Sequence, residues 1–141
     1  MAKLFTIVLG NPEHGWLPVD FQSKEFLLDF AASDVLNDPT EELYNVVTKL
    51  GEKETRRITW WLEPAAYFFD FEKNGQTITL VISETNDLNN KNCEEKKLFR
   101  IEGNEKEILQ PFRAVLKQFF SQTHDEKHWP YQLDKNKISS L

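Results

Sequence analysis

Two histidines near the C-terminal end have a spacing that can bind a metal. His124 and His128 lie four residues apart, and two imidazoles at this spacing on one helical turn can hold zinc. The intervening residues do not follow the HExxH pattern, no third ligand is apparent, and Trp129-Pro130 ends any helix here. The alternative is a solvated helix end, and we expect neither a metal nor another cofactor.

The third histidine stands beside an acid. Glu13-His14 lies in a loop bounded by glycine and proline, and Asp20, Asp29 and Asp34 could come near it. A histidine paired with a carboxylate can act as a general acid or base. Such pairs also arise by chance, so a small enzyme using His14 with these carboxylates is an alternative function. We assign no catalytic residue.

Acidic and aromatic residues meet in the segment 58–71, ITWWLEPAAYFFDF. Proline cannot donate to a sheet ladder, so Pro64 marks a turn or an edge. The strand alternation places Trp61, Glu63, Phe68 and Asp70 on one face. An aromatic pair flanked by acids is typical of a partner-binding patch, and these four residues are the predicted binding site. The alternative is that a helix covers both rings and leaves the acids at a solvent rim.

The elements that position these residues follow from periodicity. Residues 4–9, 17–21 and 26–31 alternate with period two across short turns, which predicts an antiparallel meander. Asp38-Pro39-Thr40-Glu41 is a capping pattern, and the apolar spacing that follows predicts a helix ending at Gly51.

A hairpin and a second helix complete the prediction. Asn74-Gly75 predicts a two-residue turn that places Phe69 opposite Leu80. Because Pro111 cannot sit inside an unkinked helix, the regular part of the last helix is expected at about 111–122. We predict one α+β domain over 1–141, with a single antiparallel sheet of six to seven strands in the order βββα-ββββα and two helices packed on it. The polar tail 124–141 is expected to be pinned by Trp129 and Tyr131.

The charge composition indicates which classes of partner the chain can bind. The 141-residue chain has a net charge of −6, and residues 1–72 hold thirteen Asp or Glu against six Lys or Arg, a net of −7. This acidity argues against nucleic acid and anionic membranes and favours a basic protein partner. Cys93 is the single cysteine, which excludes a disulfide within the chain and favours a reducing compartment, the cytoplasm. We read the start of the chain as a strand rather than a signal peptide.

One string resembles a known group of proteins. Trp60-x-x-Glu63-Pro64-x-x-Tyr67, preceded by Gly15-Trp16, Ser33 and Asp38-Pro39, resembles a family of small uncharacterised bacterial proteins, over roughly residues 15–82. The group has no established activity, so the resemblance implies no catalytic residue. The small acidic α+β character also resembles the immunity proteins of bacterial toxin systems. The predicted function is therefore a non-catalytic protein-binding domain, most concretely an acidic, immunity-like inhibitor of a basic bacterial protein. A homodimeric structural protein is a further alternative.

Overall fold

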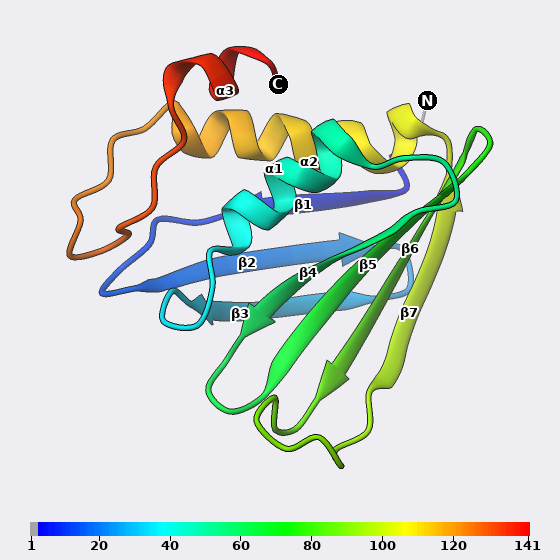
Figure 1. Cartoon of the computed structure of the whole chain (residues 1–141), viewed down its shortest axis with the longest axis horizontal. Coiled ribbons are helices and arrows are strands. Elements are labelled where there is room, and N and C mark those ends of the chain that lie inside the picture. The colour runs from blue at the N-terminus through cyan, green and yellow to red at the C-terminus, as the bar shows by residue number, and fades with distance from the viewer. Residues whose placement is uncertain (1–2) are drawn as a thin grey trace.

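A computed structural model describes residues 3–141 and contains seven strands and three helices in that range. Figure 1 shows their arrangement. In chain order the elements are β1 (Phe5–Leu9), β2 (Trp16–Ser23), β3 (Leu27–Ser33), α1 (Pro39–Lys49), β4 (Thr55–Trp61), β5 (Ala66–Asn74), β6 (Thr77–Thr85), β7 (Lys96–Gly103), α2 (Glu105–Phe120) and α3 (Lys135–Ser139).

The strands form two antiparallel sheets, so the prediction of a single sheet is wrong. β1-β2-β3 make a three-stranded sheet and β4-β5-β6-β7 a four-stranded sheet. β3 and β4 do not pair; instead Phe30 of β3 packs against Trp60 of β4, with ring centroids 5.8 Å apart. An alternating strand buries one face whether it continues a sheet or packs against another. The pattern therefore could not reveal the break at α1.

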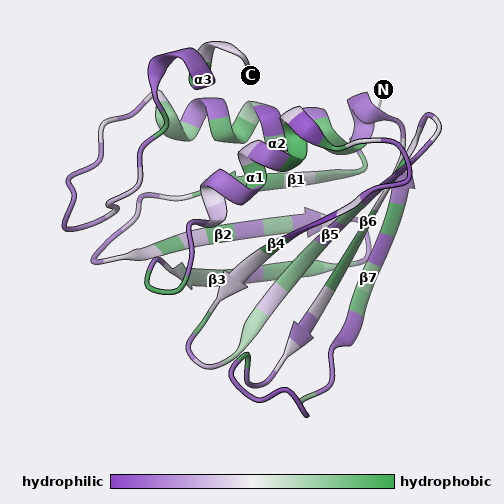
Figure 2. Ribbon diagram, viewed as in Figure 1, coloured by the Kyte–Doolittle hydropathy of each residue, from purple (hydrophilic) through white to green (hydrophobic). Residues whose placement is uncertain are grey.

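Between the sheets lies one core, to which both inner faces and the helices contribute. Phe21 of β2 contacts Phe69 of β5, with ring centroids 5.8 Å apart. Phe112 of α2 contacts both sheets: its ring centroid lies 5.4 Å from that of Phe5 and 5.1 Å from that of Phe71. Hydrophobic and hydrophilic bands alternate along the strands and helices in Figure 2, as expected for elements with one face in this core.

Helix α1 begins as its sequence predicts. The Asp38 side chain accepts hydrogen bonds from the backbone of Thr40 and Glu41, and Pro39 occupies the first turn. Burial and the neighbouring Glu41 carboxylate oppose ionisation of Asp38, and burial dominates over these hydrogen bonds, so its pKa is raised.

Helix α2 begins earlier than expected and continues through Pro111. Asn104 and Glu107 form a reciprocal capping box, which starts the helix at Glu105. Ile108 and Phe112, one turn apart on either side of the proline, are both fully buried. This shared packing favours a continuous helix over the predicted break.

The hairpin register differs from the prediction by two residues. Phe69 lies opposite Ile82 rather than Leu80, and Asn74 pairs with Thr77. The central turn residues are thus Gly75 and Gln76, and Gly75 has a φ of 64°, which suits the first position of a type II′ turn. Because the shift is even, each side chain keeps its predicted face.

The C-terminal segment packs back onto the domain and also forms α3, a third helix absent from the prediction. Trp129 is fully buried, and Tyr131 is partly buried against the core. The Tyr131 hydroxyl donates to the Asp34 carbonyl, which ties the tail to the end of β3. Among residues 3–141, no helix is both long and apolar enough to cross a membrane.

Candidate functional site

On the outer face of the four-stranded sheet, Phe68 lies beneath an arginine. The ring is only 3% exposed, and the Arg57 guanidinium lies 4.0 Å from the ring centroid, a cation–π contact. The sequence suggested either an open ring or one under a helix. A side chain of the neighbouring strand covers it instead.

Arg57 also neutralises two acids. Its Nε donates to Asp70 at 2.7 Å, and its Nη2 donates to Glu95 at 2.7 Å. Hydrogen bonds to Asp70 and then Glu95 raise the pKa of Arg57, and the bond from Arg57 lowers the pKa of Glu95. Asp70, a predicted contact residue, is therefore engaged within the chain. Glu95 comes from the β6–β7 connection, 38 residues from Arg57, and local sequence spacing gives no signal for that contact.

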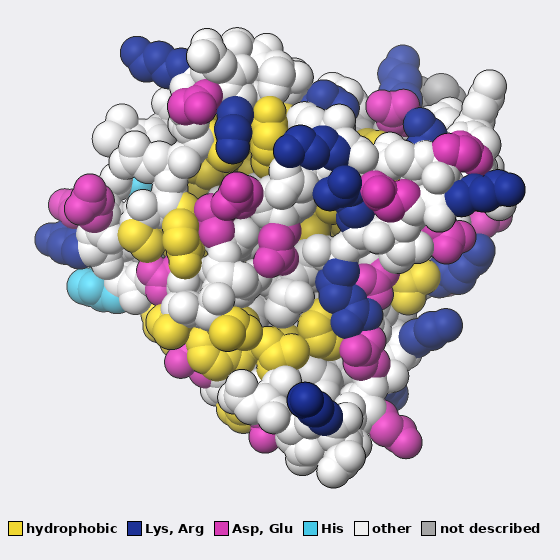
Figure 3. Space-filling model, in the orientation of Figure 1, with side chains coloured by type: hydrophobic (Ala, Val, Ile, Leu, Met, Phe, Trp, Pro, Cys, Tyr) yellow, Lys and Arg dark blue, Asp and Glu magenta, His cyan; other side chains and the backbone are white. Residues whose placement is uncertain are grey.

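Trp61 and Glu63 lie at the end of β4. Trp61 is half-buried and pairs with Ala66, whereas Phe68 pairs with Thr59. Glu63 is exposed in the following turn, with a φ of 61°. Figure 3 shows hydrophobic side chains gathered where β4 ends and β5 begins. The four predicted binding residues thus share one region, but Phe68 and Asp70 do not form an open patch with Trp61.

The structure forms neither the His124–His128 pair nor the His14–carboxylate pair that the sequence raised as possibilities. His14 and His128 meet, with ring centroids 4.9 Å apart, and the His14 backbone N–H donates to Nδ1 of His128 at 3.0 Å. His124 stacks instead on Phe119, with ring centroids 4.4 Å apart. Within residues 3–141, no group of three or more His, Cys, Asp or Glu side chains is placed to hold a metal ion. Neither of the two cavities described below is lined by His14.

The carboxylates considered for His14 lie in two places. Asp34 follows β3, where its side chain lies 2.7 Å from the position that a Cβ on Gly15 would take. The backbone at position 15 also has a φ of 85°. Both this left-handed conformation and the close Asp34 side chain favour glycine there. Asp20 and Asp29 point instead from β2 and β3 to the outer face of the three-stranded sheet.

That outer face combines exposed apolar groups with two acids. Asp20 accepts hydrogen bonds from the neutral Gln22 amide at 3.3 and 3.2 Å. Leu17, Val19 and Phe21 of β2 are fully buried on the inner side, so the intervening residues point outward. Three large hydrophobic side chains are exposed on the outer face: Val8 at 52%, Trp16 at 39% and Leu27 at 73%. We call this surface, with Asp20 and Asp29, the acidic face.

Asp20 and Asp29 are directly opposite each other in the β2–β3 register. Asp34 donates its N–H to the Gly15 carbonyl at 2.9 Å, which makes Gly15 and Asp34 a hydrogen-bonded pair. By alternation, Asp20 and Asp29 form a non-hydrogen-bonded pair, whose side chains come closest. Like charges in this arrangement are destabilising. No residue of β1, β2 or β3 is Lys or Arg, so these strands supply no compensating cation.

Comparison with known proteins adds no assignment: no family model, no curated protein and no solved structure matches this chain. The resemblance based on Trp60, Glu63, Pro64 and Tyr67 therefore stays a prediction.

Proposed function

We propose that this chain is a non-catalytic protein-binding domain that docks a basic partner protein on its acidic face. The observation that carries the proposal is the opposed pair Asp20 and Asp29, set among exposed hydrophobic side chains without a cation on the three strands. A lysine or arginine of a partner placed between the two carboxylates relieves their repulsion and forms charge-assisted hydrogen bonds. Such a cation complements both carboxylates at once.

The apolar part of the face supports the same conclusion. Tryptophan is enriched among the residues that contribute most to protein interfaces, and Trp16 is 39% exposed. The net charge of −6 favours fast association with a basic surface. A second copy of the chain is a poorer occupant, because a symmetric contact would bring Asp20 and Asp29 of each copy together.

The most concrete form of this function is an immunity-like inhibitor of a basic bacterial protein. Its support is the acidic and apolar character of the face together with the acidic N-terminal half. The predicted contacts at Trp61, Glu63, Phe68 and Asp70 form a separate hypothesis. Contacts through Phe68 and Asp70 require Arg57 to move away, because Arg57 covers the ring and binds the carboxylate.

Affinity capture from the native host with matched variants tests the proposal. A basic protein held by the wild type should be lost with Trp16→Ala and with Asp29→Lys, and retained with Glu72→Gln, which changes an exposed acid on the other sheet. The purified pair should then bind more weakly as salt rises. Retention of the partner by both acidic-face variants would contradict the proposal, as would a partner lost only with Trp61→Ala or Glu63→Gln.

A further inference from the structure

The outer edge of β1 presents unpaired backbone groups. Gly10 donates its N–H to the Pro18 carbonyl at 2.9 Å, and the register continues through Val8 opposite Asp20 and Thr6 opposite Gln22. These even-numbered residues therefore make the bonds to β2, and the N–H and C=O groups of Phe5 and Ile7 point away from it. Among residues 3–141, no strand pairs with this edge. Proteins usually cover or interrupt such an edge, because it is a template for another strand.

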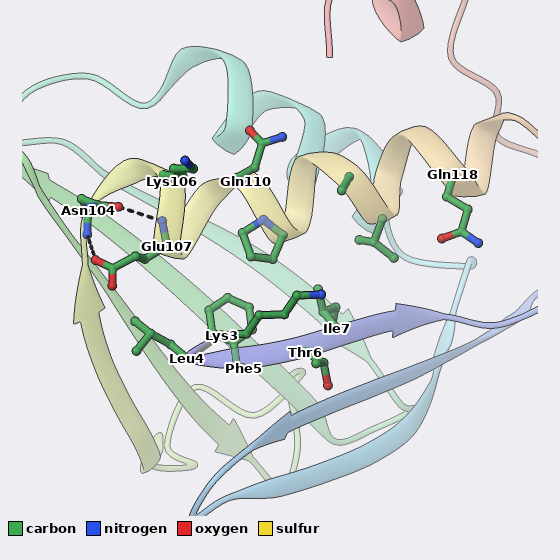
Figure 4. Close-up of a pocket in the computed structure, with 13 residues that line it drawn as sticks. Lys3, Leu4, Phe5, Thr6, Ile7, Asn104, Lys106, Glu107, Gln110 and Gln118 are labelled. Carbon is green, nitrogen blue, oxygen red and sulfur yellow. Dashed lines mark hydrogen bonds between the residues drawn. The ribbon is translucent and has the colours of Figure 1, made fainter. Parts of the chain in front are cut away.

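A groove runs between this edge and α2. It encloses about 490 Å³ between residues 3–7 and the helix, and Figure 4 shows α2 lying along β1 with the groove between them. Pro111, Ala114 and Val115 give the helical wall its apolar part. A cavity of about 90 Å³ continues the groove past Ile7, and Val115 lines both. The apolar groove thus runs along the unpaired edge of β1.

One end of the groove carries two lysines. Lys3 and Lys106 line the end where β1 and α2 both begin, together with Glu107, whose carboxylate accepts from the Asn104 N–H. In Figure 4, Lys3 extends over β1 toward Ile7. Glu105 and Glu107 lie in the first turn of α2 and oppose the helix dipole there, so the two lysines are the groups that an anion meets at this end.

We propose that this groove binds the C-terminal segment of a partner protein as a fourth strand, antiparallel to β1, with the terminal carboxylate near Lys3 and Lys106. Antiparallel pairing directs the end of the bound segment toward the start of β1, where Lys3 and Lys106 lie. Backbone bonds to Phe5 and Ile7 hold the segment, and alternate side chains enter the groove, as in β-strand addition to other sheet edges. A second copy's β1 matches the groove less well, because Phe5–Leu9 carries no charged residue.

This site is separate from the acidic face. The face uses side chains on the outer surface of the three-stranded sheet, whereas the groove uses the backbone edge of β1 and the surface of α2. Either proposal therefore stands if the other fails.

Selection from a library of random C-terminal hexapeptides with a free carboxylate supplies the probe. Sequences should be enriched on the wild-type protein relative to Ala114→Trp, which fills the groove from an exposed helix position. Ala114→Ser leaves the groove open and serves as the matched control. The best peptide should lose about tenfold in affinity when its carboxylate is amidated, as expected for loss of a charge-assisted contact. A double variant, Lys3→Glu with Lys106→Glu, should weaken the acid form at least as much, while Lys117→Glu, on α2 but outside the groove, should not.

Amide hydrogen exchange with the same peptide gives a signature specific to strand addition. The amides of Phe5 and Ile7 should exchange fast in the free protein and become protected with peptide, whereas those of Thr6 and Val8 should be protected in both states. Four results overturn the proposal: no sequence enriched over Ala114→Trp, equal binding of acid and amide peptides, binding without this alternation, or protection of Phe5 and Ile7 through a homodimer.

Discussion

On the outer face of the four-stranded sheet, Arg57 binds both Asp70 and Glu95 and covers Phe68. On the outer face of the three-stranded sheet, Asp20 faces Asp29, and Trp16 and Leu27 are exposed. The two surfaces belong to one chain and share one core, yet an arginine pairs with the acids of only one of them, and on the other Asp20 accepts only from the neutral Gln22 amide. Local arrangements that cost stability without an internal benefit tend to mark functional sites. We therefore expect a partner to bind the outer face of the three-stranded sheet.

Removal of one aromatic side chain from each face should give the largest contrast. Phe68→Ala should lower the free energy of unfolding by about 3 kcal/mol, because it empties a covered site. Trp16→Ala should cost less than about 1 kcal/mol, because part of its side chain is already in water. Urea unfolding of both variants measures this difference. Equal losses would show that the two faces are equally structural.

The arginine that covers Phe68 should contribute less than the ring itself. Arg57→Ala should destabilise the protein by about 1 to 2 kcal/mol, through loss of the cation–π contact and of the two ion pairs. Arg100→Ala is the control, because Arg100 pairs with Glu102 on the same sheet at a more exposed position. Its loss should stay within about 0.5 kcal/mol. If Arg57→Ala and Arg100→Ala lower the free energy of unfolding equally, the contact of Arg57 with Phe68 contributes nothing to stability.

Reversal of one charge on each face should change stability in opposite directions. Asp29→Lys places a cation opposite Asp20 and should raise the free energy of unfolding by about 0.5 kcal/mol. Asp70→Lys places a second cation beside Arg57 and should lower it. Paired chemical denaturation curves at neutral pH test the signs. A loss of stability with Asp29→Lys would mean that Asp20 and Asp29 do not repel each other appreciably.

The smallest effect concerns pH. Because Arg57 lowers the pKa of Glu95 below its usual 4.5, the ionised carboxylate stabilises the folded state above about pH 4.5. This contribution is lost as the pH falls through the lowered value in the folded protein. The difference in unfolding free energy between wild type and Glu95→Gln should therefore shrink on acidification from pH 6 to pH 3. In an Arg57→Ala background the same difference should be nearly independent of pH, and a persistent pH dependence there would assign it to another group.

Much of the local structure could be predicted because it depends on neighbouring residues. The capping pattern at Asp38 and the apolar spacing of α1 specify that helix without help from the rest of the chain. The inward side of β5 was also predictable, since alternation assigns Phe69 and Phe71 to the face opposite Phe68. Even the wrong hairpin register preserved these faces, because it was wrong by an even number of residues.

The candidate sites were less predictable. Pro64 lies in a turn, as its chemistry predicted, whereas Glu63 was expected on the strand and lies in the same turn. The cover over Phe68 depends on Arg57 and on Glu95, which the β6–β7 connection brings to it. The acidic face could have been found from the meander itself, since opposing β2 to β3 puts Asp20 beside Asp29. From the sequence these acids were expected near His14, whereas the fold brings His14 to His128, 114 residues away.

Local sequence thus specifies where strands and helices form and which side of each is apolar, because backbone propensity, capping and alternation act over a few residues. The tertiary structure decides that seven strands divide into two sheets, since the same inward faces can satisfy either arrangement and packing of Phe30 on Trp60 replaces hydrogen bonds between β3 and β4. It also decides which outward residues are compensated. Arg57 pairs with Asp70 and Glu95 because the folded chain brings them within hydrogen-bonding distance. Asp20 and Asp29 face each other across β2 and β3, and within residues 3–141 no strand pairs with the edge of β1 beside α2.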